Sequence, residues 1–161
     1  MAEVFEAHYR SLVRLAAMLL DDAHAAEDMA QEAYIRVATR HGRLRDPHKA
    51  LAYLRQTVVN LCRNANRRRS LAWRHSTFSS PHEASAEDGA IERFERQAVV
   101  RGLRALPRRH REAIVLRFYL DLTVEQTAAT LGLSAGAVKA YTSRGMDQLR
   151  RHLVDEGKEA R

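Results

Sequence analysis

The sequence contains few of the residues that interrupt helices or cross-link chains. It has 3 prolines and 7 glycines in 161 residues, and long stretches rich in alanine, leucine and arginine favour helix throughout. A single cysteine, Cys62, excludes an internal disulfide and suits a reducing compartment. No apolar run is long enough to span a membrane, and no N-terminal stretch resembles a signal peptide. We therefore expect an all-α, soluble, cytoplasmic protein without membrane insertion.

The sequence also lacks the patterns that carry catalysis or metal binding. Its 8 histidines form no HExxH motif, and no CxxC pair or compact ligand cluster occurs. A P-loop, a GxGxxG motif and a Gly-x-Ser-x-Gly elbow are missing as well, and Cys62 has no sequence signature of a nucleophile. We expect no catalytic residue, no metal and no cofactor, and hence a protein that is not an enzyme.

What the sequence does have is an excess of positive charge in two blocks, with a formal net charge of +7. Residues 1–69 hold 12 basic and 8 acidic side chains, and residues 101–152 hold 10 and 4. Residues 70–100, between them, hold 3 basic and 5 acidic side chains. Basic blocks favour a polyanion such as nucleic acid, because neutralised phosphates release their counterions. An ordinary solvated surface is the alternative, since 24 of the basic residues are arginines and 3 are lysines.

The first 69 residues predict a three-helix bundle, with helices expected over 4–20, 23–39 and from Asp46-Pro47 to 69. Aspartate before proline is a typical helix start, with aspartate at the N-cap and proline at the first helical position. The first helix carries apolar residues at helical spacing: Phe5, Tyr9, Leu12, Ala16 and Leu19. Residues 70–90 are small, polar and weakly periodic, which predicts a flexible linker between two small domains.

The second half predicts helices over 91–106 and 108–119, the latter with Phe118 on its apolar side, followed by a helix-turn-helix. Thr123 and Gln126 have the spacing of a capping box, and Ser134 is placed to cap the next helix after Gly132. Such a motif lays its second helix in the major groove. We expect a domain over 91–153 and a tail over 154–161.

Two groups of residues are candidates for DNA contact. On the reading helix Lys139, Tyr141 and Arg144 are expected to project from the polar side, where cations contact guanine edges or phosphates. The third helix of the bundle ends in an arginine run preceded by Asn60 and Asn64. Arginines there also complement the helix macrodipole, but asparagine is a mediocre helix former and suggests base hydrogen bonding. Weaker candidates for phosphate contact are Arg104, Arg108, Arg109 and Arg111.

The order of these segments resembles the extracytoplasmic-function sigma factors, the smallest members of the sigma-70 family. The resemblance covers nearly the whole chain apart from the linker. In the first domain it is carried by residues 26–34 (AEDMAQEAY), 52–55 (AYLR) and 58–64 (VVNLCRN). In the second domain it is carried by residues 105–113, 122–128, 136–139 and 143–146.

The resemblance implies a non-catalytic subunit that binds bacterial RNA polymerase core and directs it to promoter DNA. It implies contacts to the β′ coiled coil from Asp28, Gln31 and Glu32. It implies recognition of the −10 element by Tyr53, Asn60, Arg63, Asn64 and Arg67, and of the −35 element by Lys139, Tyr141, Ser143 and Arg144. It further implies that the second domain grips the β flap and that an inhibitory anti-sigma factor binds the chain.

The sequence departs from the family pattern at the reading helix, where Ala137 and Ala140 replace hydroxyl residues, and at Tyr53, where tryptophan is common. Three other functions stay open from the residues alone. One is a free-standing helix-turn-helix transcription regulator, which would need a dimer interface or a receiver domain. The others are a helical nucleic-acid enzyme, disfavoured by the missing carboxylate cluster, and an adaptor bundle.

Overall fold

The computed structural model describes residues 1–41, 45–73, 90–159 and 161, and its regular structure there is entirely helical. The predicted all-α fold is therefore confirmed. Contacts divide the chain into two compact units, Met1–His82 and Glu83–Arg161. Most of the predicted linker, residues 74–89, lies outside the described residues.

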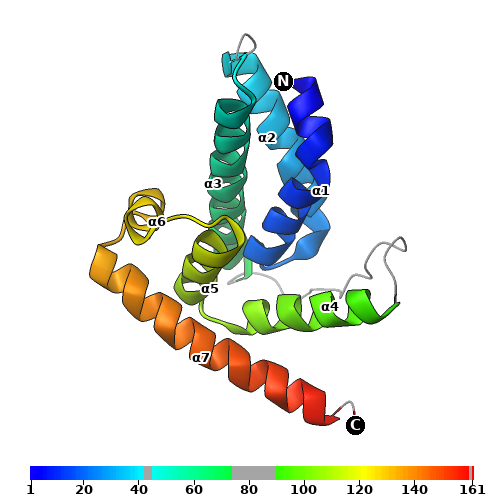
Figure 1. Ribbon diagram of the computed structural model, residues 1–161, viewed down its shortest axis with the longest axis vertical. Helices are drawn as coiled ribbons and strands as arrows, with labels where there is room; N and C mark the ends of the chain where they lie inside the picture. Colours follow the sequence, from blue (N-terminus) through cyan, green and yellow to red (C-terminus); the bar gives the residue numbers. More distant parts are fainter. Residues whose placement is uncertain (42–44, 74–89, 160) are drawn as a thin grey trace. The chain divides into compact units, whose positions relative to one another are not determined.

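The first unit contains α1 (Ala2–Leu19), a short 3₁₀ turn η1 (Ala23–Ala25), α2 (Ala26–His41) and α3 (Pro47–Trp73). The three long helices pack against one another side by side (Figure 1). Each helix buries one apolar stripe, formed by residues that recur at helical spacing, as a helical bundle requires. The buried core includes Leu12, Leu15, Leu19, Ala30, Ala33, Val37, Leu54, Val58, Val59 and Cys62.

The ends of these helices are largely where the sequence predicts them. The Asp22 side chain accepts a hydrogen bond from the backbone N–H of His24 (3.1 Å), and Asp46 accepts one from His48 (3.0 Å). However, α3 continues to Trp73, four residues beyond the predicted end at 69. The added residues include no proline or glycine, and leucine and alanine are good helix formers, so nothing local ends the helix there.

Asn66 fastens α3 to the end of α1, a role that the sequence analysis did not foresee. Its side chain is 5% exposed; Nδ2 donates to the carbonyl oxygen of Leu19 (2.8 Å), and Oδ1 accepts from the N–H of Asp21 (2.9 Å). Both backbone groups lie where α1 ends, and side chains commonly bind backbone groups at such helix ends. The Asn66 amide therefore forms hydrogen bonds with two backbone groups of the turn between α1 and α2, and these bonds fix the position of the turn along α3.

The second unit contains α4 (Ala90–Ala105), α5 (Arg108–Ile114), a π-helical turn η2 (Val115–Tyr119), α6 (Val124–Leu131) and α7 (Ala135–Glu159). Helices α4, α5 and α6 all pack on α7, which is the long diagonal helix of this unit in Figure 1. Because α7 runs to Glu159, the predicted tail over 154–161 is helical for most of its length. The core includes Leu103, Leu106, Ala113, Ile114, Val115, Leu116, Leu131, Val138 and Leu149.

The π-helical turn overturns one expectation about the apolar face of the predicted 108–119 helix. The N–H of Leu120 donates to the carbonyl of Val115 (3.1 Å), five residues back rather than four. Since each π turn takes up an extra residue, the side chains that follow are rotated away from the positions that α periodicity predicts. Phe118 is consequently 60% exposed instead of buried, and Tyr119 is exposed beside it.

The helix-turn-helix forms as predicted. The Thr123 hydroxyl accepts from the N–H of Gln126 (3.0 Å), and the Gln126 side chain accepts from the N–H of Thr123 (2.9 Å), which completes the capping box. Gly132 ends α6 in the left-handed conformation, with φ of 66°. The Ser134 hydroxyl then accepts from the N–H of Ala137 (3.1 Å) at the start of the reading helix.

Candidate nucleic-acid and partner interface

The outer face of α2 carries the three residues predicted to bind a partner. Asp28 and Gln31 are exposed; Glu32 is partly exposed and pairs with Arg36 at 2.7 Å. Ile35 lies in the middle of this face, one turn beyond Gln31, and is 56% exposed. The opposite side of α2 holds the buried residues Ala26, Ala30, Ala33 and Val37. Ile35 is not among the residues predicted from the sequence, although its spacing places this apolar side chain on the same face as Asp28 and Gln31.

The predicted −10 residues form a stripe along the outer face of α3. Tyr53, Asn60, Asn64 and Arg67 are exposed at intervals of three, four or seven residues, so they share one side of the helix. Asn60 accepts a hydrogen bond from Gln56 one turn earlier (3.3 Å). Arg63 is half-buried and lies at the margin of the stripe. The structure thus brings four of the five residues onto one open face.

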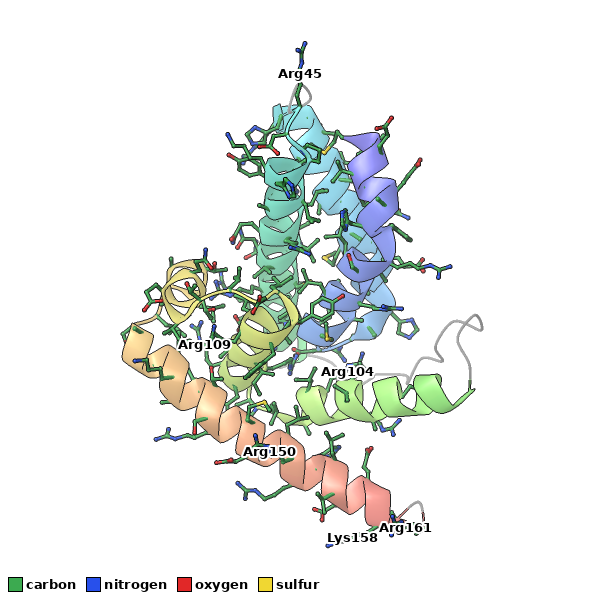
Figure 2. The ribbon with its side chains drawn as sticks, in the orientation of Figure 1. Arg45, Arg104, Arg109, Arg150, Lys158 and Arg161 are labelled. Atoms are coloured by element: carbon green, nitrogen blue, oxygen red, sulfur yellow. The ribbon has the colours of Figure 1, made fainter. Side chains whose placement is uncertain are left out.

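An aromatic stack stands at the N-terminal end of this stripe. The rings of His41, the last residue of α2, and Tyr53 are stacked with centroids 4.5 Å apart and an angle of 19° between their planes. Tyr53 nevertheless remains 45% exposed. Arg45 projects from the same end of the bundle (Figure 2). An exposed aromatic face beside cations is the kind of surface on which unpaired bases stack.

On the reading helix α7, three of the four predicted residues are open to solvent and one is not. Lys139, Ser143 and Arg144 are exposed. Tyr141 is half-buried, with its ring tilted against that of His110 on α5 at 5.3 Å. The expectation that Tyr141 projects from the polar side is therefore wrong, because the ring packs on α5 instead of facing outward.

The arginines of α5 divide between surface and interior. Arg109 is exposed (Figure 2), in keeping with a phosphate contact. Arg111 is 4% exposed, and its Nε donates to the carbonyl of Leu103 at the end of α4 (3.1 Å). The candidate phosphate contact from Arg111 is thus wrong: its guanidinium satisfies a helix end inside the unit.

A groove runs beside the reading helix, between α7 and the π-helical turn. It is lined by cations and by exposed or half-buried apolar side chains, among them Arg117, Phe118, Lys139, Met146 and Arg150. The Arg117 guanidinium donates to the carbonyl of Leu122, which fixes the loop that leads into α6. Lys139, a predicted −35 residue, and the exposed ring of Phe118 therefore line the same groove.

Within the described residues, no group of three or more His, Cys, Asp and Glu side chains is arranged to hold a metal ion. Cys62 is buried in the first unit, and this burial raises the pKa of its thiol from 9.0 to about 12, which keeps it protonated and unreactive. Within the described residues, no helix is both long and apolar enough to cross a membrane.

Comparison with known families accounts for both units. The "Sigma-70 region 2" family matches residues 4–74, and the "Sigma-70, region 4" family matches residues 102–151. The RNA polymerase sigma-E factors of Streptomyces avermitilis and Streptomyces coelicolor are 33% and 34% identical to the chain. These alignments cover 98% of the chain and 89% and 90% of the relatives. The chain is an extracytoplasmic-function sigma factor of the sigma-70 family. The resemblance seen in its sequence is confirmed.

Two further comparisons agree with this assignment. The sigma factor is 30% identical to the ECF RNA polymerase sigma factor SigE of Mycolicibacterium smegmatis, over 98% of the chain and 63% of that relative. Its fold matches the sigma factor RpoE of Bartonella quintana, crystallised with the anti-sigma factor NepR, with a TM-score of 0.73 and 23% identity. That match covers 94% of the sigma factor and 92% of RpoE. Sigma factors direct promoter-specific initiation and leave catalysis to the polymerase.

Proposed function

We propose that the sigma factor binds core RNA polymerase through α2 and reads two promoter elements, the −10 element through α3 and the −35 element through α7. The observation that carries this proposal is that both family regions occur in order in one chain, each with most of the expected polar residues exposed on a helix. Such a subunit works beside the polymerase in the cytoplasm. The exposed faces of α2, α3 and α7 each support one part of the proposal.

For the polymerase contact, the α2 face supplies an apolar centre within a polar, acidic rim. Acidic residues in the first turn of a helix, here Glu27 and Asp28, also interact favourably with its dipole, so they do not identify an interface by themselves. Ile35 supports the proposal, because it places an aliphatic side chain that is 56% exposed among these polar residues. The partner that fits is a basic helix with an aliphatic contact point, which suits the β′ coiled coil.

For the −10 element, the stripe on α3 combines hydrogen-bonding amides with a stacking surface. Asn60 and Asn64 offer donor and acceptor atoms to the edge of a base that has left the helix. Tyr53 offers a ring face, and Arg67 a charge for the phosphate backbone. Amides alone would read a sequence, but opening the duplex also requires a surface that holds unpaired bases.

For the −35 element, Lys139, Ser143 and Arg144 lie on the open side of the reading helix, where a helix-turn-helix meets the major groove. The rings of Phe118 and Tyr119, 60% and 38% exposed, form an aromatic surface on the second unit. We assign these two rings to the β flap. An anti-sigma factor would compete for the same exposed faces, and the likeness to RpoE, which was crystallised with NepR, supports such a partner.

Run-off transcription tests the proposal. Purified core polymerase is incubated with and without the sigma factor on a library of templates with a randomised upstream region, and the transcribed templates are sequenced. We expect transcripts that depend on the sigma factor, with two enriched elements upstream of each start site. No transcripts, together with tight DNA binding in the absence of core polymerase, would instead identify a free-standing regulator.

A further inference from the structure

His110 of α5 sits in a socket on the inner side of the reading helix. Its Nδ1 lies 2.8 Å from Oε1 of Gln148, and its ring packs on that of Tyr141 with centroids 5.3 Å apart. Between these two contacts is Gly145: a Cβ added there would meet the His110 Cβ at 3.1 Å and the His110 carbonyl oxygen at 3.4 Å. The three residues of α7 that form this socket, Tyr141, Gly145 and Gln148, therefore follow one another at intervals of about one turn.

The socket faces away from Lys139 and Ser143, two of the three exposed residues of α7 that are proposed to read DNA. At about 100° per residue, Tyr141, Gly145 and Gln148 share one face, and Lys139 and Ser143 lie roughly half a turn away. A rotation of α7 about its axis would therefore move the base-reading side chains by the same angle. The contacts to His110 limit this rotation, since the tilted ring contact with Tyr141 and the hydrogen bond to Gln148 hold the same face of α7 at points about two turns apart.

The hydrogen bond also fixes the position of α7 along its axis. An amide oxygen can only accept, so Nδ1 of His110 carries the proton that is donated to Gln148. Gly145 lets α5 and α7 approach closely, because the residue carries no side chain where Ile114 Cδ1 lies 2.7 Å from the ideal Cβ position. On the other side, α5 is anchored to α4 through the buried Arg111.

We propose that His110 is a positioning residue for −35 recognition, which sets the rotation and the axial position of the reading helix against α5. It contacts no base itself; its effect passes through Tyr141, Gly145 and Gln148 to Lys139 and Ser143. This inference rests on the proposed function of α7. It predicts that loss of His110 weakens the choice between −35 sequences more than it weakens transcription as a whole.

The test compares variants of the full-length sigma factor in the holoenzyme on the same randomised library. His110→Ala removes the ring and the donor, whereas His110→Asn keeps a donor near the position of Nδ1. Gln148→Met removes the acceptor and leaves His110 in place. His152→Ala is the matched control, because His152 is another half-buried histidine of this unit, adjacent to Gly102 of α4 rather than in the socket.

In the wild type, the favoured base at each −35 position is expected to exceed the others by about tenfold, within the usual range for one base pair. We expect His110→Ala and Gln148→Met to reduce this preference to about twofold while the −10 preference stays unchanged. His110→Asn should restore most of it, and His152→Ala should leave both preferences at wild-type values.

One result would contradict the positioning role of His110, and a different result would contradict the proposed function of the sigma factor. If folded His110→Ala and Gln148→Met holoenzymes give the wild-type −35 preference, His110 is only a packing residue. If the wild-type holoenzyme enriches no upstream element at all, the proposed function fails before His110 is tested. Circular dichroism and thermal unfolding identify a variant that is not folded, and the remaining variant of the pair then decides the question.

Discussion

At the scale of the residue, asparagines on α3 serve different purposes within a few positions. Asn60 and Asn64 are exposed, where we propose that they contact DNA, whereas Asn66 is buried and bound to the backbone at the end of α1. The sequence shows the same residue type at all three positions, and asparagine is unfavourable in a helix at each of them. Only the direction of the side chain, which follows from helix phase and from the neighbouring helix, separates the roles.

Replacing Asn66 by alanine should therefore affect stability, whereas replacing Asn64 by alanine should affect transcription. Asn66→Ala removes the hydrogen bonds to the Leu19 carbonyl and the Asp21 N–H, so we expect the free energy of unfolding to fall by about 2–3 kcal/mol. Asn64→Ala should change it by less than about 0.5 kcal/mol, yet reduce transcription in the run-off assay. Urea unfolding monitored by circular dichroism gives the first quantity. Equal destabilisation by both substitutions would contradict the assignment of Asn66.

Cys62 should make stability depend on alkaline pH. Its pKa is raised by burial from 9.0 to about 12, so the folded state holds a proton that the unfolded state releases above pH 9. The contribution of the protonated thiol to the free energy of unfolding is complete below pH 9, and it is lost as the pH rises towards 12. At pH 10.5 the loss should be about 2 kcal/mol.

The measurement is the difference in free energy of unfolding between the wild type and Cys62→Ala as a function of pH. That difference should be constant from pH 7 to 8.5 and then move against the wild type. In addition, the native protein should react with a thiol reagent at pH 8 at least about a hundredfold more slowly than the protein in urea. Rapid labelling of the native protein would show that the thiol is accessible.

At the scale of the element, the sequence predicts what local patterns determine. Helical spacing of apolar residues predicts α1 to α3, and Thr123, Gln126 and Ser134 predict the caps of the helix-turn-helix, because each depends on residues within one turn. The exposed faces of α2 and α3 could be predicted in the same way. These features account for most of the fold and for most of the candidate site.

The features that the sequence does not predict depend on contacts between helices or on an irregular turn. Phe118 was assigned to an apolar face because α periodicity was assumed, and the π-helical turn changes that phase. Tyr141 and Arg111 look like surface residues until α5 is placed against α7 and α4. The end of α3 was placed too early because an arginine run was treated as a helix end.

Two glycines of α7 should respond differently to replacement by alanine. A Cβ at Gly145 would lie 2.7 Å from Ile114 Cδ1 and 3.1 Å from His110 Cβ, so Gly145→Ala should push α7 from α5 and cost about 1–3 kcal/mol. Gly157 has open space around it, and Gly157→Ala should gain up to about 1 kcal/mol through helix propensity. Thermal unfolding measures both. A gain at Gly145 would contradict the close approach of the two helices.

At the scale of the whole molecule, each unit has its own buried core. We expect fragments 1–73 and 90–161 to fold separately, with helical circular dichroism and cooperative unfolding. Mixed but unlinked, they should support promoter-directed transcription only at far higher concentration than the intact chain. A connecting segment raises the effective concentration of the second unit to the millimolar range. Equal activity of the mixture and the intact chain at nanomolar concentration would contradict this expectation.

The π-helical turn at Val115–Tyr119 also has a genetic consequence. Because it holds one residue more than an α-helical turn, it is equivalent to an in-frame insertion of a single codon. Deleting one codon there would restore a regular helical turn, while residues up to Ile114 and the helix-turn-helix that follows kept their register. A lineage could thus lengthen or shorten this segment by one residue in one mutational event, without redesigning the helix-turn-helix that follows.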